Sequence, residues 1–158
     1  MPIGAALPGN QIYANAKVLM HVGYNNKGIV GVTNKALWKA LLLWEGGQFN
    51  PMASNVSDVD SNEVSGGGYA RQALTNVALG WVGDYVVVTS DPVYFSALPP
   101  GRLITGMVLF IEGTSRTDSP LMCMPNGISK SGLQFPFVST SNGALVACGS
   151  ATGWMMLS

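Results

Sequence analysis

The sequence predicts an all-β protein with a single domain, a two-sheet β-sandwich of which the jelly roll is one version, behind an extended N-terminal arm. Turn-forming residues recur at short intervals along the chain, which is typical of many short strands. The segments between them are apolar and several are rich in β-branched and aromatic residues. A chain of 158 residues can bury a sizeable core. We therefore expect the arm at 1–15 and one sandwich domain at 16–158.

The first 44 residues are expected to supply the arm and the first strands. Prolines and glycines keep the leading residues extended. The stretch 16–23 alternates imperfectly and predicts a strand, and 29–33 predicts a second one after a turn at 25–28. The apolar run 38–44 predicts a buried strand, with a short helix as the alternative.

The rest of the chain reads as a long loop followed by many short strands. The loop covers 48–68, and loops of that length are usually functional or ordered by partners. Asn126-Gly127 and Asn142-Gly143 predict hairpin turns. Further strands are expected at 69–79, 84–89, 93–98, 103–112, 121–124, 134–139, 144–148 and 154–157.

The most informative stretch is the end of this loop, where acidic residues run into three consecutive glycines and then into a tyrosine and an arginine. Glycines adopt backbone angles that are closed to other residues, so the chain can reverse there. Glu63 and Arg71 flank the bend with opposite charges in a charge-poor chain, and we expect both to be satisfied in the fold. The candidate residues of this loop and bend are Asp58, Asp60, Glu63, Gly66, Gly67, Gly68, Tyr69 and Arg71.

The segment 38–73 resembles a family of small bacteriophage virion proteins. The resemblance rests on the apolar run 38–43, on Ser57-Asp58-Val59, and on the Glu-Val-Ser-Gly-x-Gly-Tyr pattern at 63–69. It extends more weakly to Tyr94-Phe95 and 107–111. It implies a β-rich module that is added to the virion in multiple copies.

The function that this resemblance implies is structural. The expected role is a minor capsid or decoration protein, made in the host cytoplasm and placed on the capsid exterior, with the major capsid protein as partner. A tail, baseplate or fibre component is the alternative within phage biology. A subunit that binds only to the assembled lattice, and not to free capsid proteins, would stabilise that lattice by mass action.

Composition also favours assembly. Charged residues make up 10% of the chain, well below the roughly 25% of soluble proteins. From residue 119 onwards, Lys130 is the only charged side chain. Such a surface is expected to be buried in part against other copies, and we expect a homotrimer, with a dimer as the next choice. The alternative is a compact monomer whose surface is carried by Ser, Thr, Asn and Gly.

The N-terminal segment is the expected docking arm. Residues 1–44 carry four lysines and no acid, whereas residues 45–158 hold all eight acids. Four dispersed lysines do not form the dense basic face of a nucleic-acid-binding protein. The candidate docking residues are the apolar anchors Ile3, Leu7 and Ile12 together with Lys17.

The sequence offers little catalytic chemistry. His21 is the only histidine and has no nucleophile motif nearby, so we expect no enzyme. Asp58, Asp60 and Asn62 imitate the opening of a calcium loop, but Glu63 stands where an EF-hand needs glycine. We therefore expect no metal and no cofactor, with a calcium site of another type as the alternative.

Three further expectations complete the sequence reading. Cys123 and Cys148 are expected to be thiols rather than a disulfide. No apolar run approaches the ~20 residues of a membrane-spanning helix, so no membrane partner is expected. A carbohydrate-binding module is the rival of a different class, with a stacking platform drawn from the aromatic residues Trp38, Trp44, Tyr69, Trp81, Tyr85 and Tyr94.

Overall fold

A computed structural model of the chain describes residues 11–22, 37–125, 135–146, 148 and 153–157. Ile3 and Leu7 of the predicted arm, the predicted strand 29–33 and the Asn126-Gly127 turn lie outside these residues. Within them strands are the main regular structure, beside one α-helix and short 3-10 turns, and all strand pairs are antiparallel. The predicted all-β, sandwich-like fold class is therefore confirmed.

The strands of the described residues form three sheets. The largest has the order β2-β1-β6-β7, and β8 pairs with β6 as well. A second sheet has the order β10-β4-β3, and a third pairs β5 with β9. The strand bounds are β1 Trp38–Trp44, β2 Gln72–Ala73, β3 Ala78–Val82, β4 Tyr85–Thr89, β5 Val93–Phe95, β6 Leu103–Ile111, β7 Leu121–Cys123, β8 Phe137–Val138, β9 Ala144–Val146 and β10 Met155–Leu157.

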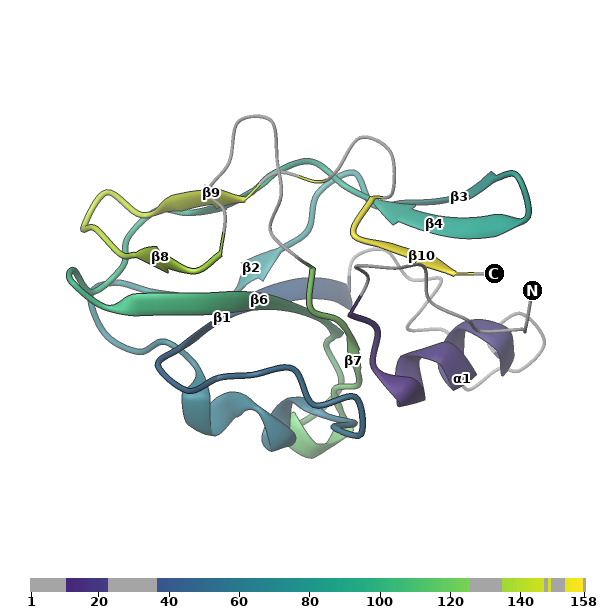
Figure 1. Ribbon diagram of the computed structural model, residues 1–158, viewed down its shortest axis with the longest axis horizontal. Helices are drawn as coiled ribbons and strands as arrows, with labels where there is room; N and C mark the ends of the chain where they lie inside the picture. Colours follow the sequence, from purple (N-terminus) through teal and green to yellow (C-terminus); the bar gives the residue numbers. More distant parts are fainter. Residues whose placement is uncertain (1–10, 23–36, 126–134, 147, 149–152, 158) are drawn as a thin grey trace.

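The sheets are arranged as two layers (Figure 1). The large sheet, with β1 and β6 at its centre, forms one layer, and the two smaller sheets together form the other. This division differs from the two four-stranded sheets of a jelly roll.

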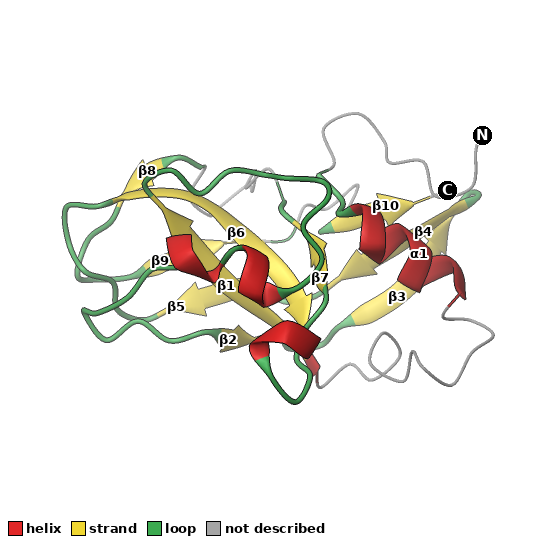
Figure 2. Cartoon of the chain, turned by 90° about the horizontal axis from the view of Figure 1, so that it is seen from below, coloured by secondary structure: helices red, strands yellow, loops and turns green. Residues whose placement is uncertain are grey.

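β1 and β6 are covered on both faces, which explains their continuous apolar sequences. Residues 41–43 of β1 and 107–110 of β6 are all fully buried. The smaller sheets cover one face, and the segment after β1 covers the other with the buried side chains Ala53, Val56 and Val59. This segment contains the 3-10 turns η3 Val56–Asp58 and η4 Asp60–Asn62, which lie across the large sheet (Figure 2). The predicted loop is thus an integral cover of the core.

The predicted first strand at 16–23 is wrong, because its described residues, 16–22, lie in the α-helix α1, Ala14–Val22. Ala14, Ala16, Lys17, Leu19 and Met20 are all good helix formers. Tyr13 and Ala16 are fully buried and Met20 packs against the core, so the apolar positions follow a helical spacing of three and four residues. The prediction gave too much weight to a weak alternation.

The predicted strand 69–79 is divided between two sheets. β2 pairs with β1 in the large sheet, whereas β3 pairs with β4 in the second. Between them Asn76 has a left-handed backbone with φ of +52°, and its side-chain amide donates to Asp91 Oδ2 at 2.6 Å. Asparagine tolerates this conformation better than most residues. The chain can therefore leave one sheet and enter the other there.

Asn142-Gly143 forms a turn, but it does not join two neighbouring strands. Gly143 N donates to Thr140 O at 3.1 Å, and Gly143 has φ of +79°. The strands on either side pair elsewhere, β8 with β6 and β9 with β5. The turn is thus a crossing between the two layers rather than the predicted hairpin.

Candidate functional site

The three glycines form a tight bend that packs against the backbone after β5. Gly66, Gly67 and Gly68 all have positive φ, at +86°, +64° and +86°. A Cβ atom at Gly67 would lie 2.3 Å from the backbone nitrogen of Pro99, whereas one at Gly66 would meet nothing. The glycine expectation is therefore met, since the bend requires both the left-handed angles and, at Gly67, the missing side chain.

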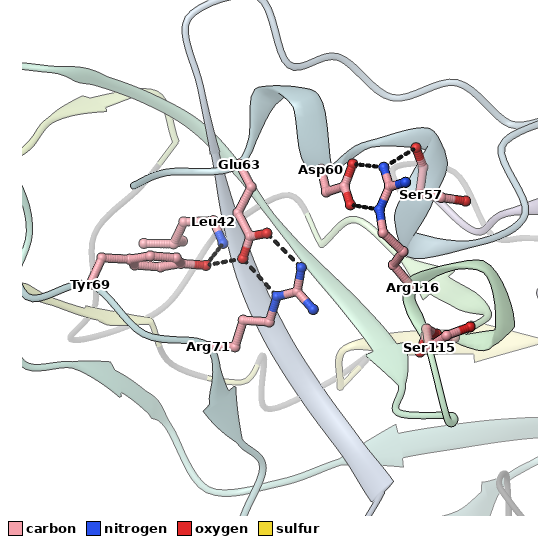
Figure 3. A network of polar contacts seen from close by, with 9 residues as sticks. Leu42, Ser57, Asp60, Glu63, Tyr69, Arg71, Ser115 and Arg116 are labelled. Carbon is pink, nitrogen blue, oxygen red and sulfur yellow. Dashed lines mark hydrogen bonds and ion pairs between the residues drawn. The ribbon is translucent and has the colours of Figure 1, made fainter. Parts of the chain in front are cut away.

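The bend brings Tyr69 and Arg71 next to Glu63, the acidic residue that precedes the glycines (Figure 3). Arg71 donates to Glu63 through Nε at 2.8 Å and through Nη2 at 2.7 Å, so the pair is bidentate. Tyr69 OH donates to Glu63 Oε1 at 2.9 Å and accepts from Leu42 N, on β1, at 3.0 Å. We call Glu63, Tyr69 and Arg71 the Glu63 network.

This network is anchored to the core rather than exposed as a binding surface. The Glu63 side chain is 13% exposed and that of Arg71 is 36% exposed. The Arg71 guanidinium lies 5.4 Å from the centre of the Phe110 ring, and Tyr69 stacks on Phe95 at 6.0 Å. Burial raises the pKa of Tyr69 far above its usual value, and the hydrogen bond to Glu63 raises the pKa of Arg71. Tyr69 therefore stays a neutral donor and Arg71 a cation.

The other acids of the loop have separate structural partners. Asp58 Oδ2 accepts from the backbone N–H groups of Ser54 at 2.8 Å and Asn55 at 3.1 Å, and these bonds lower its pKa. Asp60 forms a bidentate pair with Arg116, at 2.6 Å for both bonds, which lowers the pKa of Asp60. Each carboxylate therefore stays ionised and fixes a turn.

The calcium alternative gains no support from this geometry. Asp58 holds two backbone N–H groups through Oδ2, and both carboxylate oxygens of Asp60 bind Arg116. No group of three or more acids, cysteines and histidines converges among the described residues. The arrangement is a scaffold of satisfied hydrogen bonds, which can hold a loop against a sheet.

The described docking candidates have different environments. Ile12 is 3% exposed, forms a β-bridge with Cys123 and belongs to the core. Its side chain is thus committed to the domain and cannot serve as an anchor on another protein while the fold is intact. Lys17 lies half-exposed on α1.

Sequence reasoning missed a second polar cluster at the end of β1. The Arg102 guanidinium lies 3.9 Å from the centre of the Trp44 ring and forms a bidentate pair with Glu45, at 2.6 and 2.8 Å. An open hollow of about 500 Å³ lies beside this cluster, lined by Gln11, Gly46, Gly47, Gln48, Phe49, Leu103, Thr105, Met124 and Pro136. This cluster could not be predicted from the sequence, because residues 44–49 and 102–105 are far apart in the chain. The pairing of β1 with β6 brings them together.

The proposed aromatic platform is not assembled. Trp38 is fully buried, Tyr69 packs on the core, and Trp44 lies under Arg102. Trp81 and Tyr94 are well exposed, but they belong to different sheets. The prediction of one stacking surface made of all six residues is therefore wrong.

Comparison of the chain with protein-family models, with curated proteins and with solved structures found no match in any of the three. Among the described residues, no helix is long and apolar enough to cross a membrane. The likeness to phage virion proteins thus rests on the motif residues alone.

Proposed function

We propose that this protein is a non-enzymatic structural component of a bacteriophage virion. In this proposal it is a minor capsid or decoration protein that binds the outer surface of the capsid in many copies and stabilises the lattice. It is made in the host cytoplasm, its partners are the major capsid protein and further copies of itself, and it needs neither metal nor cofactor.

The observation that carries this proposal is the exposed apolar surface of a charge-poor chain. Two exposed apolar pairs lie directly across strand ladders, Tyr94 with Leu145 and Leu103 with Val138. β8 and β9, which supply one partner each, lie at the same end of the molecule in both views (Figures 1 and 2). Exposed apolar patches of this kind are typical of surfaces that other proteins or further copies cover. Among the described residues, the large exposed apolar side chains are Val18, Met52, Trp81, Val82, Tyr94, Leu103, Val138 and Leu145.

The motif that resembles the phage family supports the same proposal in a different way. In this chain the side chains of the motif hold the 48–68 segment on the large sheet through the Glu63 network. No group of potential metal ligands converges there among the described residues. A loop that is held firmly on its sheet suits a component of a lattice.

The decisive experiment is to image intact particles and locate this chain. Decoration predicts hundreds of copies on the capsid exterior, whereas a tail, baseplate or fibre component would be present in few copies at one vertex. Absence from purified particles would overturn both versions of the virion proposal.

A matched pair of deletions tests the docking arm. Removing residues 1–10 spares the core residue Ile12, so the domain should still fold, and the proposal expects particle occupancy to fall. Removal of 1–12 also takes Ile12 from the core and should lower stability. Normal occupancy after the shorter deletion would move the docking surface to the sandwich.

A carbohydrate-binding module is the second candidate, favoured by the hollow beside Trp44. Its lining combines Phe49, on which a sugar ring can stack, with the amides of Gln11 and Gln48, which can bind hydroxyl groups. Screening of the purified protein against host-surface glycans tests it. Binding that is lost in Phe49→Ala would favour this candidate, and an absence of binding would remove it.

A further inference from the structure

β3 is the outermost strand of the second sheet. The sheet has the order β10-β4-β3, and among the described residues β4 is the only strand that pairs with β3. Four of the five residues of β3 are exposed, among them Trp81 at 66% and Val82 at 51%. In both views the β3–β4 hairpin lies at the opposite end of the molecule from β8 and β9 (Figures 1 and 2). One edge of β3 therefore has no strand beside it in the described part of the chain.

This edge lacks the features that protect edge strands in other proteins. Such strands usually carry a charged residue, a proline or a β-bulge. The sequence of β3 is Ala-Leu-Gly-Trp-Val, and the strand pairs with β4 along its whole length without a shift in register. A regular and uncharged edge is a template on which a further strand can add through main-chain hydrogen bonds.

The turn of the hairpin determines which backbone groups of β3 face this edge. Only two residues connect Val82 to Tyr85, so these paired residues exchange the hydrogen bonds that close the turn. Bonded and non-bonded pairs alternate along an antiparallel ladder, so Gly80, two residues before Val82, also bonds to β4. The N–H and C=O groups of Leu79 and Trp81 therefore point away from β4, towards the open edge.

We propose that β3 pairs with the β3 of a second copy of this chain, antiparallel and about a twofold axis at Gly80. In this register Leu79 of each copy lies opposite Trp81 of the other, and the outward N–H and C=O groups of both residues are bonded. An axis at Leu79 or at Trp81 would instead place the other of these residues opposite a position outside β3. The two three-stranded sheets join into one continuous sheet.

The side chains of β3 favour a second copy as the partner. Leu79 packs against the core, and Trp81, two residues on, lies on the same face of the sheet. The pairing brings the exposed indole of Trp81 beside Leu79 of the other copy, and the twofold axis repeats this contact. An added Cβ at Gly80 would meet no atom within 4 Å, so the chain leaves the position of the axis open.

A second copy also removes two open edges at once, because it presents the same unbonded groups and the same exposed indole. An unrelated strand would cover only one such edge. No charged side chain lies in β3, so the two copies meet without repulsion between like charges across the ladder.

The inference goes beyond the proposed function, because the pairing requires two copies of the chain and no capsid. Each copy contributes five residues, and small contacts of this kind are weak in solution. Copies that are held close together on a surface would form the contact more readily than dilute copies. The exposed apolar pairs at β8 and β9 lie at the other end of the molecule, so they remain free for a different contact (Figure 1).

The first test measures amide hydrogen exchange of the full chain by NMR at increasing protein concentration. We expect the amides of Leu79 and Trp81 to become protected as the concentration rises, because pairing between copies gives them acceptors. The amide of Gly80, which bonds to β4, should be protected at every concentration and is the internal control.

Two results of this measurement would overturn the proposal. One is an exchange at Leu79 and Trp81 that does not change up to millimolar concentration. The other is full protection of both amides in dilute protein that contains no dimer, because another segment of the chain would then cover the edge.

The second test determines the register with two variants at exposed positions of β3, Ala78→Cys and Val82→Cys. In the proposed pairing, residue 78 of one copy lies opposite residue 82 of the other, at about 4.5 Å between Cα atoms, which is within the range of a disulfide. The two copies of residue 78 would lie about 13 Å apart, as would the two copies of residue 82. A mixture of the variants under mild oxidation should therefore give a mixed disulfide dimer, whereas neither variant alone should form a dimer through these positions.

Mass spectrometry distinguishes these products. Trypsin releases either new cysteine in the peptide 72–102, whose mass differs between the two variants, and Cys148 falls in a different peptide. The Tm of each variant, measured with the thiols reduced, checks that the fold is unchanged. Mixed dimer and homodimers in the proportions of chance encounters would refute the register and with it the proposed pairing.

Discussion

Two arginine–carboxylate pairs of equal geometry differ in their surroundings, and this difference predicts their contributions. The guanidinium of Arg71 lies over Phe110 and its side chain is 36% exposed, whereas that of Arg116 is 58% exposed. The partner carboxylates are similarly buried, Glu63 at 13% and Asp60 at 16% exposed. Arg71→Ala would leave Glu63 without its cation and should lower the free energy of unfolding by roughly 1 to 3 kcal/mol.

The matched control is Arg116→Ala, for which solvent screening predicts a smaller loss. Urea unfolding of both variants at neutral pH measures the difference. Equal losses of unfolding free energy in the two variants would mean that Arg71 contributes no more than an exposed surface ion pair does.

Gly66 and Gly67 have similar backbone angles, but the space around their Cα atoms differs. Adding one methyl group should therefore lower the free energy of unfolding by different amounts at the two positions. Gly66→Ala adds a Cβ that meets nothing, so only the left-handed backbone is penalised, by about 1 to 2 kcal/mol. Gly67→Ala adds the same penalty and drives the Cβ into the backbone at Leu98 and Pro99, which should raise the loss above about 3 kcal/mol. Denaturant unfolding checks the order, and a loss at Gly66 that matches or exceeds the one at Gly67 would contradict it.

At the scale of elements, the 48–64 segment owes its shape to ionised carboxylates. The backbone N–H groups of Ser54 and Asn55 hold the pKa of Asp58 below its usual range, and Arg116 does so for Asp60. A lowered pKa in the folded state means that the unfolded chain binds protons more readily. The stabilisation is therefore present above about pH 4 and is lost as pH falls through the folded-state pKa values.

Asp58→Ala should thus lower the free energy of unfolding by about 1 kcal/mol at pH 7. The gap between this variant and the wild type should narrow below about pH 4, where protonation removes the same interactions from the wild type. Urea unfolding at pH 7 and pH 3 provides the measurement. A gap that does not change with pH would show that charge at Asp58 has no part in holding the turn.

Strands with strong local signals were predictable, and those that depend on distant partners were not. Trp38–Trp44 and the core of 103–112 are continuous apolar runs, and both form the buried centre of the large sheet. The helix α1 was missed because its buried side, with Tyr13 and Ala16, is recognisable only against β7. Periodicity over nine residues is too weak to decide between a helix and a strand without that contact.

The candidate site was predictable in part for the same reason. The opposite charges of Glu63 and Arg71 around the glycines indicated a local pair, and the structure contains it. The partnership of Asp60 with Arg116 spans 56 positions and joins η4 to η5, Arg116–Asp118. No spacing rule reveals such a contact, because tertiary packing alone creates it.

At the scale of the molecule, charge is sparse where apolar side chains are exposed. Val138 is 63% exposed on β8, within a C-terminal region in which Lys130 is the only charged residue. A contact between copies removes its surface from water, and an uncharged surface avoids the cost of burying unpaired charges. These facts favour the C-terminal region as the contact of the trimer that we expect.

This expectation gives a matched test with two valines of similar exposure. Val138→Lys would place one charge per subunit in the proposed contact and should shift the purified protein from trimer towards monomer, with little change in Tm. Val18→Lys changes a valine that is 57% exposed on α1 and should leave assembly unaltered. Sedimentation velocity over a dilution series measures both variants and the wild type. A wild-type protein that stays monomeric at all concentrations would refute self-association in solution, and loss of assembly in Val18→Lys alone would move the contact from the C-terminal region to α1.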